Sequence, residues 1–200
     1  MLFCALSGTS FAAIIVFTED YRKMDTLKGR PDNSEGRIPQ EMRSYDLLDS
    51  LNIAYEQVDH AAADTIEICL ERSAVLGTRI CKNLFLCNRQ ETVFYLLIMP
   101  ADKQFKTSVV SSQLGVARLH FADESFMERF LNLRPGSVSV LGLMHDRENS
   151  VRLLMDRDIL NQAYFACHPC INTSSLKFLT SELLEKLLPA MGHEPTFISL

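Results

Sequence analysis

Ile80–Asn88 (ICKNLFLCN) and Thr92–Pro100 (TVFYLLIMP) are two apolar runs separated by only three polar residues. Runs of this length, rich in aromatic and branched residues and joined by a short polar connection, predict a β-hairpin of central strands. Lys82 interrupts the first run, and burial of an unpaired ammonium group is costly. Two interpretations of Lys82 stay open on this pattern, an edge lysine whose amine reaches solvent and a functional cation.

Helices and strands are predicted on both sides of this hairpin. Before it, Pro39–Leu51 has apolar residues at helical spacing and proline in its first turn, Ile53–Val58 follows as a strand, and Asp64 caps a helix over Thr65–Leu76. After it, the patterns predict helices over 107–114, over 123–133 with Asp123 as cap, and over 181–188 with Thr180 as cap. They predict strands over 116–121, 141–144, 151–155, 163–166 and 196–200. Residues 156–160 are predicted as a turn or helical piece, and residues 167–175 as a loop. This order predicts one mixed domain.

Composition sets limits on size and partners. The chain has 200 residues, 47% hydrophobic and 22% charged, with a formal net charge of −5. That balance is ordinary for a globular chain with a sizeable core, and it argues against a protein that coats nucleic acid through a generally basic surface. Local basic patches stay open, one formed by Lys103, Lys106 and Arg118 and one by Arg79 and Lys82.

Two parts are predicted, a poorly ordered extension over residues 1–38 and a domain over 39–200. Leu2–Phe17 is almost free of charge, yet it is short for a bilayer span and has no basic residue ahead of it, so we expect neither a signal peptide nor a membrane anchor. A further hypothesis is that the natural start is Met24.

Six cysteines, at positions 4, 69, 81, 87, 167 and 170, are too few and too dispersed for a disulfide framework, so we expect reduced thiols and a cytoplasmic protein. Cys167-His-Pro-Cys170 has the spacing of a redox pair or of half a zinc site. Its loop-forming context disfavours a redox pair, and Cys81 and Cys87 have the wrong spacing to complete a zinc site. We therefore expect no metal and no cofactor, and keep a thiol oxidoreductase using Cys167 and Cys170 as a minor alternative.

Arg134–Leu143 (RPGSVSVLGL) is the candidate functional loop. Pro135 and Gly136 predict a turn, and such a turn can direct successive backbone N–H groups into one concavity that holds an anion or a developing oxyanion. His168 and Asn172, on the later loop, can present hydrogen-bond donors to a ligand. A simple turn between two elements is the alternative.

Five motifs then occur in order along the chain: Lys82-Asn83-Leu-Phe-Leu, Leu97-Ile-Met-Pro-Ala-Asp102-Lys, Pro135-Gly-Ser-Val-Ser, His168-Pro-Cys-Ile-Asn172-Thr and Gly192-His-Glu-Pro. With these motifs, residues 39–200 resemble the YbaK/ProX family of aminoacyl-tRNA deacylases. The resemblance is strongest to the free-standing prolyl-tRNA editing proteins related to the insertion domain of bacterial prolyl-tRNA synthetase.

The resemblance implies a mixed α/β fold with a central, largely antiparallel sheet flanked by helices. It also implies hydrolysis of the ester in a mischarged tRNA, with Ala-tRNA(Pro) as the expected substrate and cysteine or serine as other amino acids. It assigns Lys82 as the catalytic residue and places Asn83, Gly136, Ser137, Val138, His168 and Asn172 in the substrate pocket. The family's Gly-x-x-x-Pro loop maps onto Gly136–Val140, where Val140 stands in place of the proline.

An aminoacyl ester is already activated, so positioning and oxyanion stabilisation can suffice without a nucleophilic side chain. We expect a monomer that binds the acceptor end of tRNA weakly and does not bind membranes, with prolyl-tRNA synthetase as a further partner. The main alternative is a non-catalytic regulator of the same fold that binds tRNA or an amino acid. The only sequence feature that favours it is Val140 in place of the family's proline.

Overall fold

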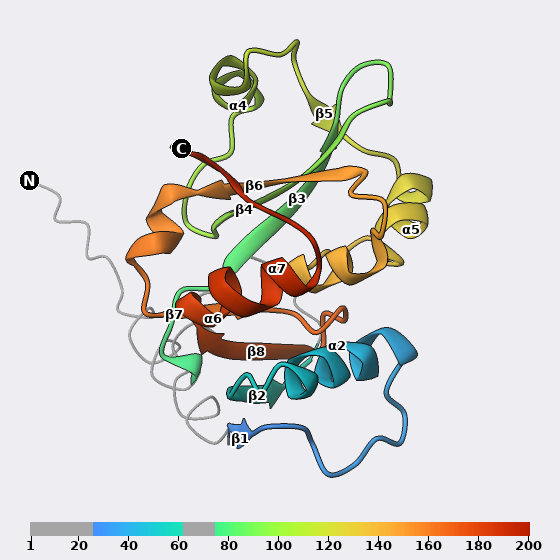
Figure 1. Cartoon of the computed structure of the whole chain (residues 1–200), viewed down its shortest axis with the longest axis vertical. Coiled ribbons are helices and arrows are strands. Elements are labelled where there is room, and N and C mark those ends of the chain that lie inside the picture. Colours follow the sequence, from blue (N-terminus) through green and yellow to red (C-terminus); the bar gives the residue numbers. More distant parts are fainter. Residues whose placement is uncertain (1–25, 62–74) are drawn as a thin grey trace, which may run out of the picture.

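The computed structural model describes residues 26–61 and 75–200, which form two β-sheets with helices on their faces (Figure 1). The five-stranded sheet has the order β5-β3-β4-β6-β9, and the four-stranded sheet has the order β1-β2-β8-β7. The strands of the five-stranded sheet are β3 (Cys81–Cys87), β4 (Phe94–Pro100), β5 (His120–Phe121), β6 (Val151–Asp156) and β9 (Thr196–Ile198). Those of the four-stranded sheet are β1 (Leu27–Lys28), β2 (Tyr55–Asp59), β7 (Tyr164–Cys167) and β8 (Ser174–Leu179). The mixed α/β class is confirmed, with two sheets where one central sheet was predicted.

The predicted hairpin is the middle of the larger sheet. β3 and β4 pair antiparallel over their full length, from Cys81 opposite Pro100 to Cys87 opposite Phe94. β4 and β6 are parallel, as are β6 and β9, whereas every pairing of the smaller sheet is antiparallel. Arg89-Gln-Glu91 forms the connection of a hairpin that is buried on both faces.

The helical elements are α2 (Pro39–Ser50), α4 (Thr107–Leu114), α5 (Glu124–Leu131), the 3₁₀ helices η1 (Val140–His145) and η2 (Arg157–Asn161), and a C-terminal run of α6 (Thr180–Glu182), η3 (Leu183–Leu187, a π-helix) and α7 (Leu188–Ala190). Asp123 caps α5, as predicted, because its carboxylate accepts the Ser125 N–H at 2.9 Å. The predicted helix over Thr65–Leu76 lies almost wholly outside the described residues. No helix among the described residues has the length and apolar character needed to cross a bilayer.

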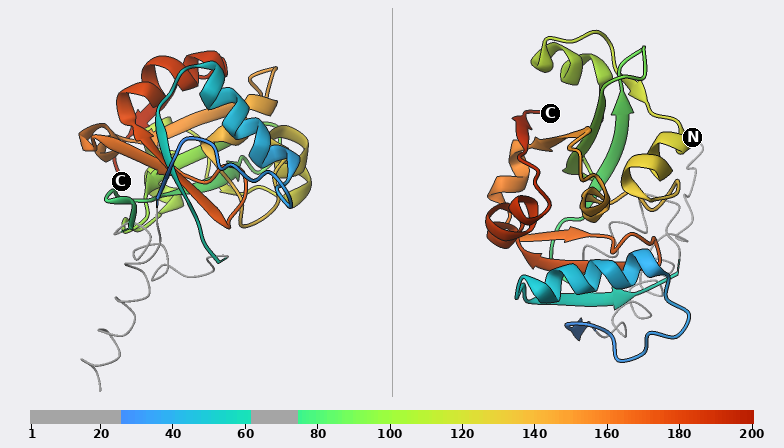
Figure 2. Two further views of the ribbon diagram at one scale, coloured as in Figure 1. Left: turned by 90° about the horizontal axis from the view of Figure 1, so that it is seen from below. Right: turned by 45° about the vertical axis from the view of Figure 1, so that its right-hand side comes forward.

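Apolar side chains cover the two faces of the larger sheet with different partners. The inner face, which carries Phe85 and Leu96, packs with Phe165 and Phe178 of the smaller sheet in one continuous cluster. Figure 2 shows the two sheets as separate layers. The outer face packs Leu86, Leu97 and Met99 against α4 and Leu119. Because successive strand residues point to opposite faces, neighbours in β3 belong to different environments.

Three sequence predictions in this region are wrong. Residues 141–144 form η1 where a strand was predicted, and Gly142 allows this because a Cβ there would lie 2.7 Å from the Leu133 side chain. The predicted strand 116–121 shrinks to β5, since only Leu86 and Cys87 of β3 reach it. β8 starts inside the predicted loop 167–175, where two polar residues, Ser174 and Ser175, are buried and paired with β2.

Thr180 does not cap the final helix. Leu179 is the N-cap residue, because β8 runs directly into α6 and the Thr180 N–H donates to the Ala163 carbonyl at 3.0 Å. Within the described residues, the Thr180 hydroxyl is buried without a hydrogen-bond partner.

Residues ahead of Pro39 contact the domain. β1 pairs with β2, Arg30 forms ion pairs with Asp46 and Asp49, and Arg37 pairs with Glu41 and Asp59. Ordered structure thus starts before the predicted boundary at Pro39. The sequence of this segment predicts a polar loop, but a two-residue strand and ion pairs with α2 and β2 hold it against the domain.

Candidate active site

The turn at Arg134–Ser137 lies at the centre of the candidate site. The Ser137 N–H donates to the Arg134 carbonyl at 3.1 Å, and Gly136 has a φ angle of +84°. A positive φ at the residue after proline is typical of a type II turn and selects glycine. The Ser137 hydroxyl donates to the same carbonyl at 2.8 Å, so two hydrogen bonds from Ser137 stabilise the turn.

The turn uses one of the three amides predicted to face a ligand. The Ser137 N–H is engaged by the Arg134 carbonyl, whereas the N–H groups of Gly136 and Val138 have no acceptor among the described residues. The prediction of three ligand-facing amides at residues 136–138 is therefore reduced to two. Two converging N–H groups are sufficient for an oxyanion hole.

Buried Ser139 ties this turn to the later loop. Its hydroxyl donates to the His168 carbonyl at 2.5 Å and accepts the Leu141 N–H at 3.2 Å, which caps η1. A Cβ placed on Gly136 would lie 3.7 Å from the side-chain nitrogen of Asn172. Two segments about 30 residues apart are thereby held together, with the Asn172 amide beside the glycine turn.

Two histidines extend this cluster. The Nδ1 atom of His168 lies 2.9 Å from the Ser174 carbonyl, which can only accept, so Nδ1 carries the proton of the neutral ring. The His60 ring packs edge-on against it with centroids 6.3 Å apart, and His60 Nε2 contacts the Ser175 hydroxyl at 2.8 Å. His60 ends the β2 region, and the sequence offered no signal for it beyond its place after a strand.

Lys82 lies near the start of β3 and is half-buried. Its ammonium donates to the carbonyls of Ala101, at 3.2 Å, and of Lys103. An ammonium has three donors, so one is left for another acceptor. No carboxylate within residues 26–61 and 75–200 forms an ion pair with Lys82, so its charge is fixed in place and uncompensated there.

Asn83, the next residue, points to the inner face of the sheet, shared with Cys81 and Phe85. Its side-chain oxygen is buried without a hydrogen-bond partner in the described part of the chain. An unsatisfied buried oxygen is costly and commonly marks a place where a ligand or water supplies the donor. Asn83 can therefore accept a hydrogen bond from a bound group.

The thiols of the Cys-x-x-Cys motif lie in the core. Burial raises the pKa of Cys170 to about 12, raises the pKa of Cys167 well above its ordinary value, and raises that of Cys81 to about 12. A reactive redox cysteine is exposed and has a lowered pKa, so these thiols have the opposite character. Among the described residues, no group of three histidine, cysteine or acidic side chains is placed to hold a metal.

The two basic clusters suggested by the sequence are partly neutralised. Lys103 forms ion pairs with Asp156 and Asp158, and Arg79 pairs with Asp102. Lys106 and Arg118, unlike Lys103, form no ion pair within the described residues, so their charges are not neutralised there.

The structure thus brings together Gly136, His168 and Asn172, and it adds Ser139 and His60, which sequence reasoning missed. Lys82 is not hydrogen-bonded to any of them in the described part, and it points to the outer face of the sheet. A link exists through the core, because Cys81 of β3 packs in the same buried cluster as Cys167 and Cys170, and β3 contacts β7. The loop cluster therefore lies beside the inner side of the β3 start, and Lys82 on the outer side.

The chain is similar to known editing proteins over most of its length. Residues 60–186 match the family of the aminoacyl-tRNA editing domain. The prolyl-tRNA editing protein ProX of Acetoanaerobium sticklandii is 30% identical over 146 residues, which are 73% of this chain and 88% of that protein. The prolyl-tRNA synthetase associated domain-containing protein 1 of Mus musculus is 30% identical over 172 residues, 83% of this chain and 97% of that protein.

Solved structures share the fold. A protein described as a candidate trans-editing enzyme for prolyl tRNA synthetase superimposes with a TM-score of 0.60 at 15% identity and covers 82% of this chain and 98% of its own. The hypothetical protein APE2540 gives a TM-score of 0.56 at 17% identity, covering 72% and 92%. The family match spans Lys82, the glycine turn and the His168–Asn172 loop, so the chain belongs to the aminoacyl-tRNA editing domain family, within its YbaK/ProX-type editing proteins.

Proposed function

We propose that this editing-domain protein is a trans-acting deacylase that hydrolyses the aminoacyl ester of mischarged tRNA(Pro), with Ala-tRNA(Pro) as its main substrate. The observation that carries the proposal is the contact between the Gly136 turn and the His168–Asn172 loop, inside the segment that matches the editing domain. The contact brings the Asn172 amide beside the glycine turn, and donors from two adjacent loops are what stabilisation of an oxyanion in acyl transfer uses.

The reaction needs no nucleophilic side chain. Water attacks the ester carbonyl, the carbonyl oxygen takes up negative charge, and collapse of the intermediate releases the amino acid and the terminal ribose hydroxyl of the tRNA. The N–H groups of Gly136 and Val138 and the Asn172 amide stabilise the oxyanion. A neighbouring ribose hydroxyl of the substrate assists proton transfer from the water.

Lys82 anchors the substrate by charge. With two donors on the Ala101 and Lys103 carbonyls, its third donor takes a phosphate oxygen of the terminal nucleotide. Asn83, whose oxygen is buried without a partner among the described residues, accepts a hydrogen bond from the substrate, for which the ammonium group of the amino acid is the natural donor. His168 lines the pocket.

Alanine is the expected amino acid on chemical grounds. A synthetase pocket built for proline cannot strongly reject a smaller amino acid, since each missing methylene contributes about 1–3 kcal/mol of discrimination. A second pocket that admits alanine and excludes proline completes the sieve. Cysteine and serine are close enough in size to be tested beside it.

The test is ester hydrolysis by the full-length chain on Ala-, Cys-, Ser- and Pro-tRNA(Pro), with and without prior thiol alkylation. We expect Ala-tRNA(Pro) to be hydrolysed fastest, Pro-tRNA(Pro) to be spared, and alkylation to have no effect. Binding of tRNA without loss of any ester would instead support the non-catalytic regulator. Loss of activity on alkylation would favour cysteine chemistry, which the buried thiols disfavour.

A further inference from the structure

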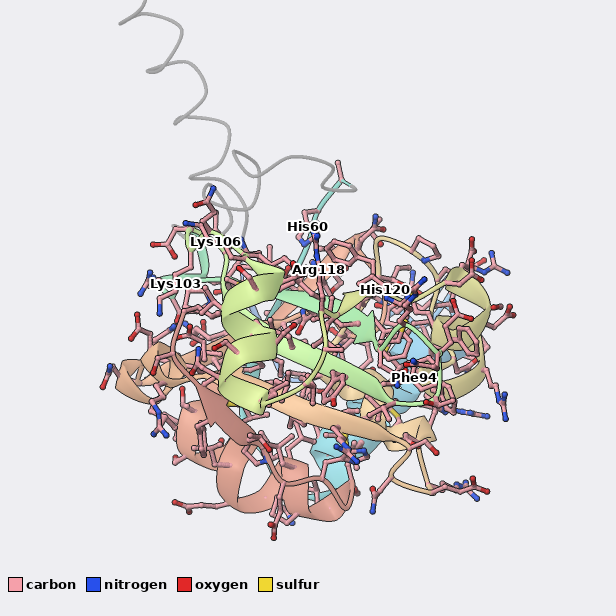
Figure 3. The ribbon with its side chains drawn as sticks, turned by 90° about the horizontal axis from the view of Figure 1, so that it is seen from above. His60, Phe94, Lys103, Lys106, Arg118 and His120 are labelled. Carbon is pink, nitrogen blue, oxygen red and sulfur yellow. The ribbon has the colours of Figure 1, made fainter. Side chains whose placement is uncertain are left out.

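A depression of about 810 Å³ lies between the start of α4 and β5, on the outer face of the larger sheet. Its lining includes Phe105, Lys106, Arg118, His120 and Phe121, and we call it the α4–β5 groove. Figure 3 looks down on α4, with Lys106, Arg118 and His120 following one another across the upper part of the view. None of these residues belongs to the cluster around Gly136.

The groove carries positive charge that nothing in the described chain neutralises. Arg89, Lys106 and Arg118 all line it, no aspartate or glutamate does, and within residues 26–61 and 75–200 none of the three cations forms an ion pair. By contrast, nearby Lys103 is neutralised by two carboxylates. In a chain with a formal net charge of −5, such a patch attracts a polyanion to one place.

An aromatic side chain stands exposed inside this charge. Phe121 is 59% exposed, and its ring contacts that of Phe105 with centroids 5.7 Å apart. Phe121 lies in β5 and is paired with Leu86 of β3. An exposed ring flanked by cations is the usual platform for stacking an unpaired base while the phosphates are neutralised.

The groove is joined to Lys82. Lys82, Leu84 and Leu86 share the outer face, and Leu86 lies opposite Phe121 in the sheet register. The carbonyl of Lys103 that accepts from Lys82 is only two residues before Phe105. Lys82 is therefore linked to the groove through the segment 101–106 that leads into α4, while the outer face between them is covered by apolar side chains.

We propose that the α4–β5 groove binds the single-stranded acceptor end of the substrate tRNA, with Lys106 and Arg118 on its phosphates and a base stacked on Phe121. The inference rests on the proposed function, since the ester lies at the terminal ribose and the preceding nucleotides must lie next to the site. The charge and the exposed ring favour RNA over an acidic protein, which offers no bases to stack.

Binding of unacylated tRNA(Pro) transcript to the full-length chain, followed by fluorescence anisotropy at several salt concentrations, tests the groove. We expect Arg118→Gln to weaken binding several-fold and to reduce the salt slope by about 1. Phe121→Ala should weaken binding about tenfold while leaving the salt slope unchanged. Arg43→Gln, which removes an exposed arginine on α2 in the other half of the molecule, is the matched control and should bind as the parent does.

Phe121→Leu keeps the apolar volume without an aromatic face, so the test survives if the alanine variant folds poorly. The same variants in the deacylation assay should raise KM and leave kcat unchanged. Tight groove-dependent binding without hydrolysis would reject the proposed function and keep the groove. Hydrolysis with unchanged KM and affinity in both groove variants would overturn the groove. Heparin, a polyanion without bases, is the comparison ligand. The groove would also be overturned if Arg118→Gln weakened the binding of heparin and of tRNA equally and Phe121→Ala had no effect on tRNA binding.

Discussion

The inner and outer faces of the five-stranded sheet carry different chemistry at the start of the same strand. On the inner face, Asn83 shares its side with Cys81, which packs in one cluster with Cys167, the residue before the His168–Asn172 loop. On the outer face, Lys82 holds an uncompensated positive charge close to a cationic groove. The alternation of side chains along β3 thus places two consecutive residues in different environments, and in the proposed function Asn83 serves the ester and Lys82 the RNA.

Loss of the outer-face cation should have the largest effect. Lys82→Met keeps most of the aliphatic stem and removes the charge, and we expect kcat/KM for Ala-tRNA(Pro) to fall about 100-fold or more, because a preorganised charged donor cannot be replaced by water. Lys186→Met, which removes an exposed lysine from the C-terminal helix, is the control. Near-normal turnover by the Lys82 variant in a folded protein would remove its role.

Loss of an inner-face donor should have a smaller effect. Asn172→Ala deletes the amide beside Gly136, and we expect kcat to fall roughly tenfold because two backbone N–H groups still hold the oxyanion. The salt dependence of tRNA binding should not change. A variant that lost affinity with unchanged kcat would place Asn172 in RNA binding and would break the division between the faces.

The link between the two inner-face loops should be visible in stability. Ser139→Ala leaves the His168 carbonyl and the Leu141 N–H without their partner, and we expect the free energy of unfolding to fall by about 1–3 kcal/mol in urea titration. Ser108→Ala, on the exposed side of α4, should change it by less than about 0.5 kcal/mol. Equal effects in the two variants would argue against the tether.

A proline at position 140, where the family resemblance leads us to expect one, should be tolerated. Val140 is the first residue of η1, and Ser139 has φ −142° and ψ 151°, the extended geometry that precedes proline. We expect Val140→Pro to change the free energy of unfolding by no more than about 1 kcal/mol. Leu141→Pro, which deletes the N–H bonded to Ser139, should cost about 3 kcal/mol. Selectivity between Ala- and Ser-tRNA(Pro) measures whether the stiffer loop sharpens the pocket.

The smallest expected effect concerns pH. Burial, with Arg43 and Arg147 nearby, lowers the pKa of His145 in the folded protein. The unfolded chain binds the proton near pH 6.5 and the folded chain only at lower pH, so stability should decline as pH falls below about 6.5. His145→Gln should reduce that decline between pH 7 and 5. An unchanged slope in thermal melts over this range would contradict it.

Much of the fold was predictable from local pattern. The β3–β4 hairpin is two long apolar runs, α4 begins and ends at the expected residues, α2 ends one residue before the expected Leu51, and Asp123 caps α5. The start of β8 was predicted as a loop, because its first residues, Ser174 and Ser175, are polar and are buried only through pairing with β2. η1 escaped because the close approach of Gly142 to Leu133 exists only in the packed chain.

The amino-acid sequence by itself determined the family, the glycine turn and the identity of the residues around it, because turn chemistry and motif order are local properties. Only the tertiary structure decided which of these residues meet. It joined Gly136 to Asn172, took one amide of the turn for an internal hydrogen bond, and directed Lys82 to the opposite face from Asn83. Those outcomes depend on strand register and on contacts between distant segments, which no local pattern encodes.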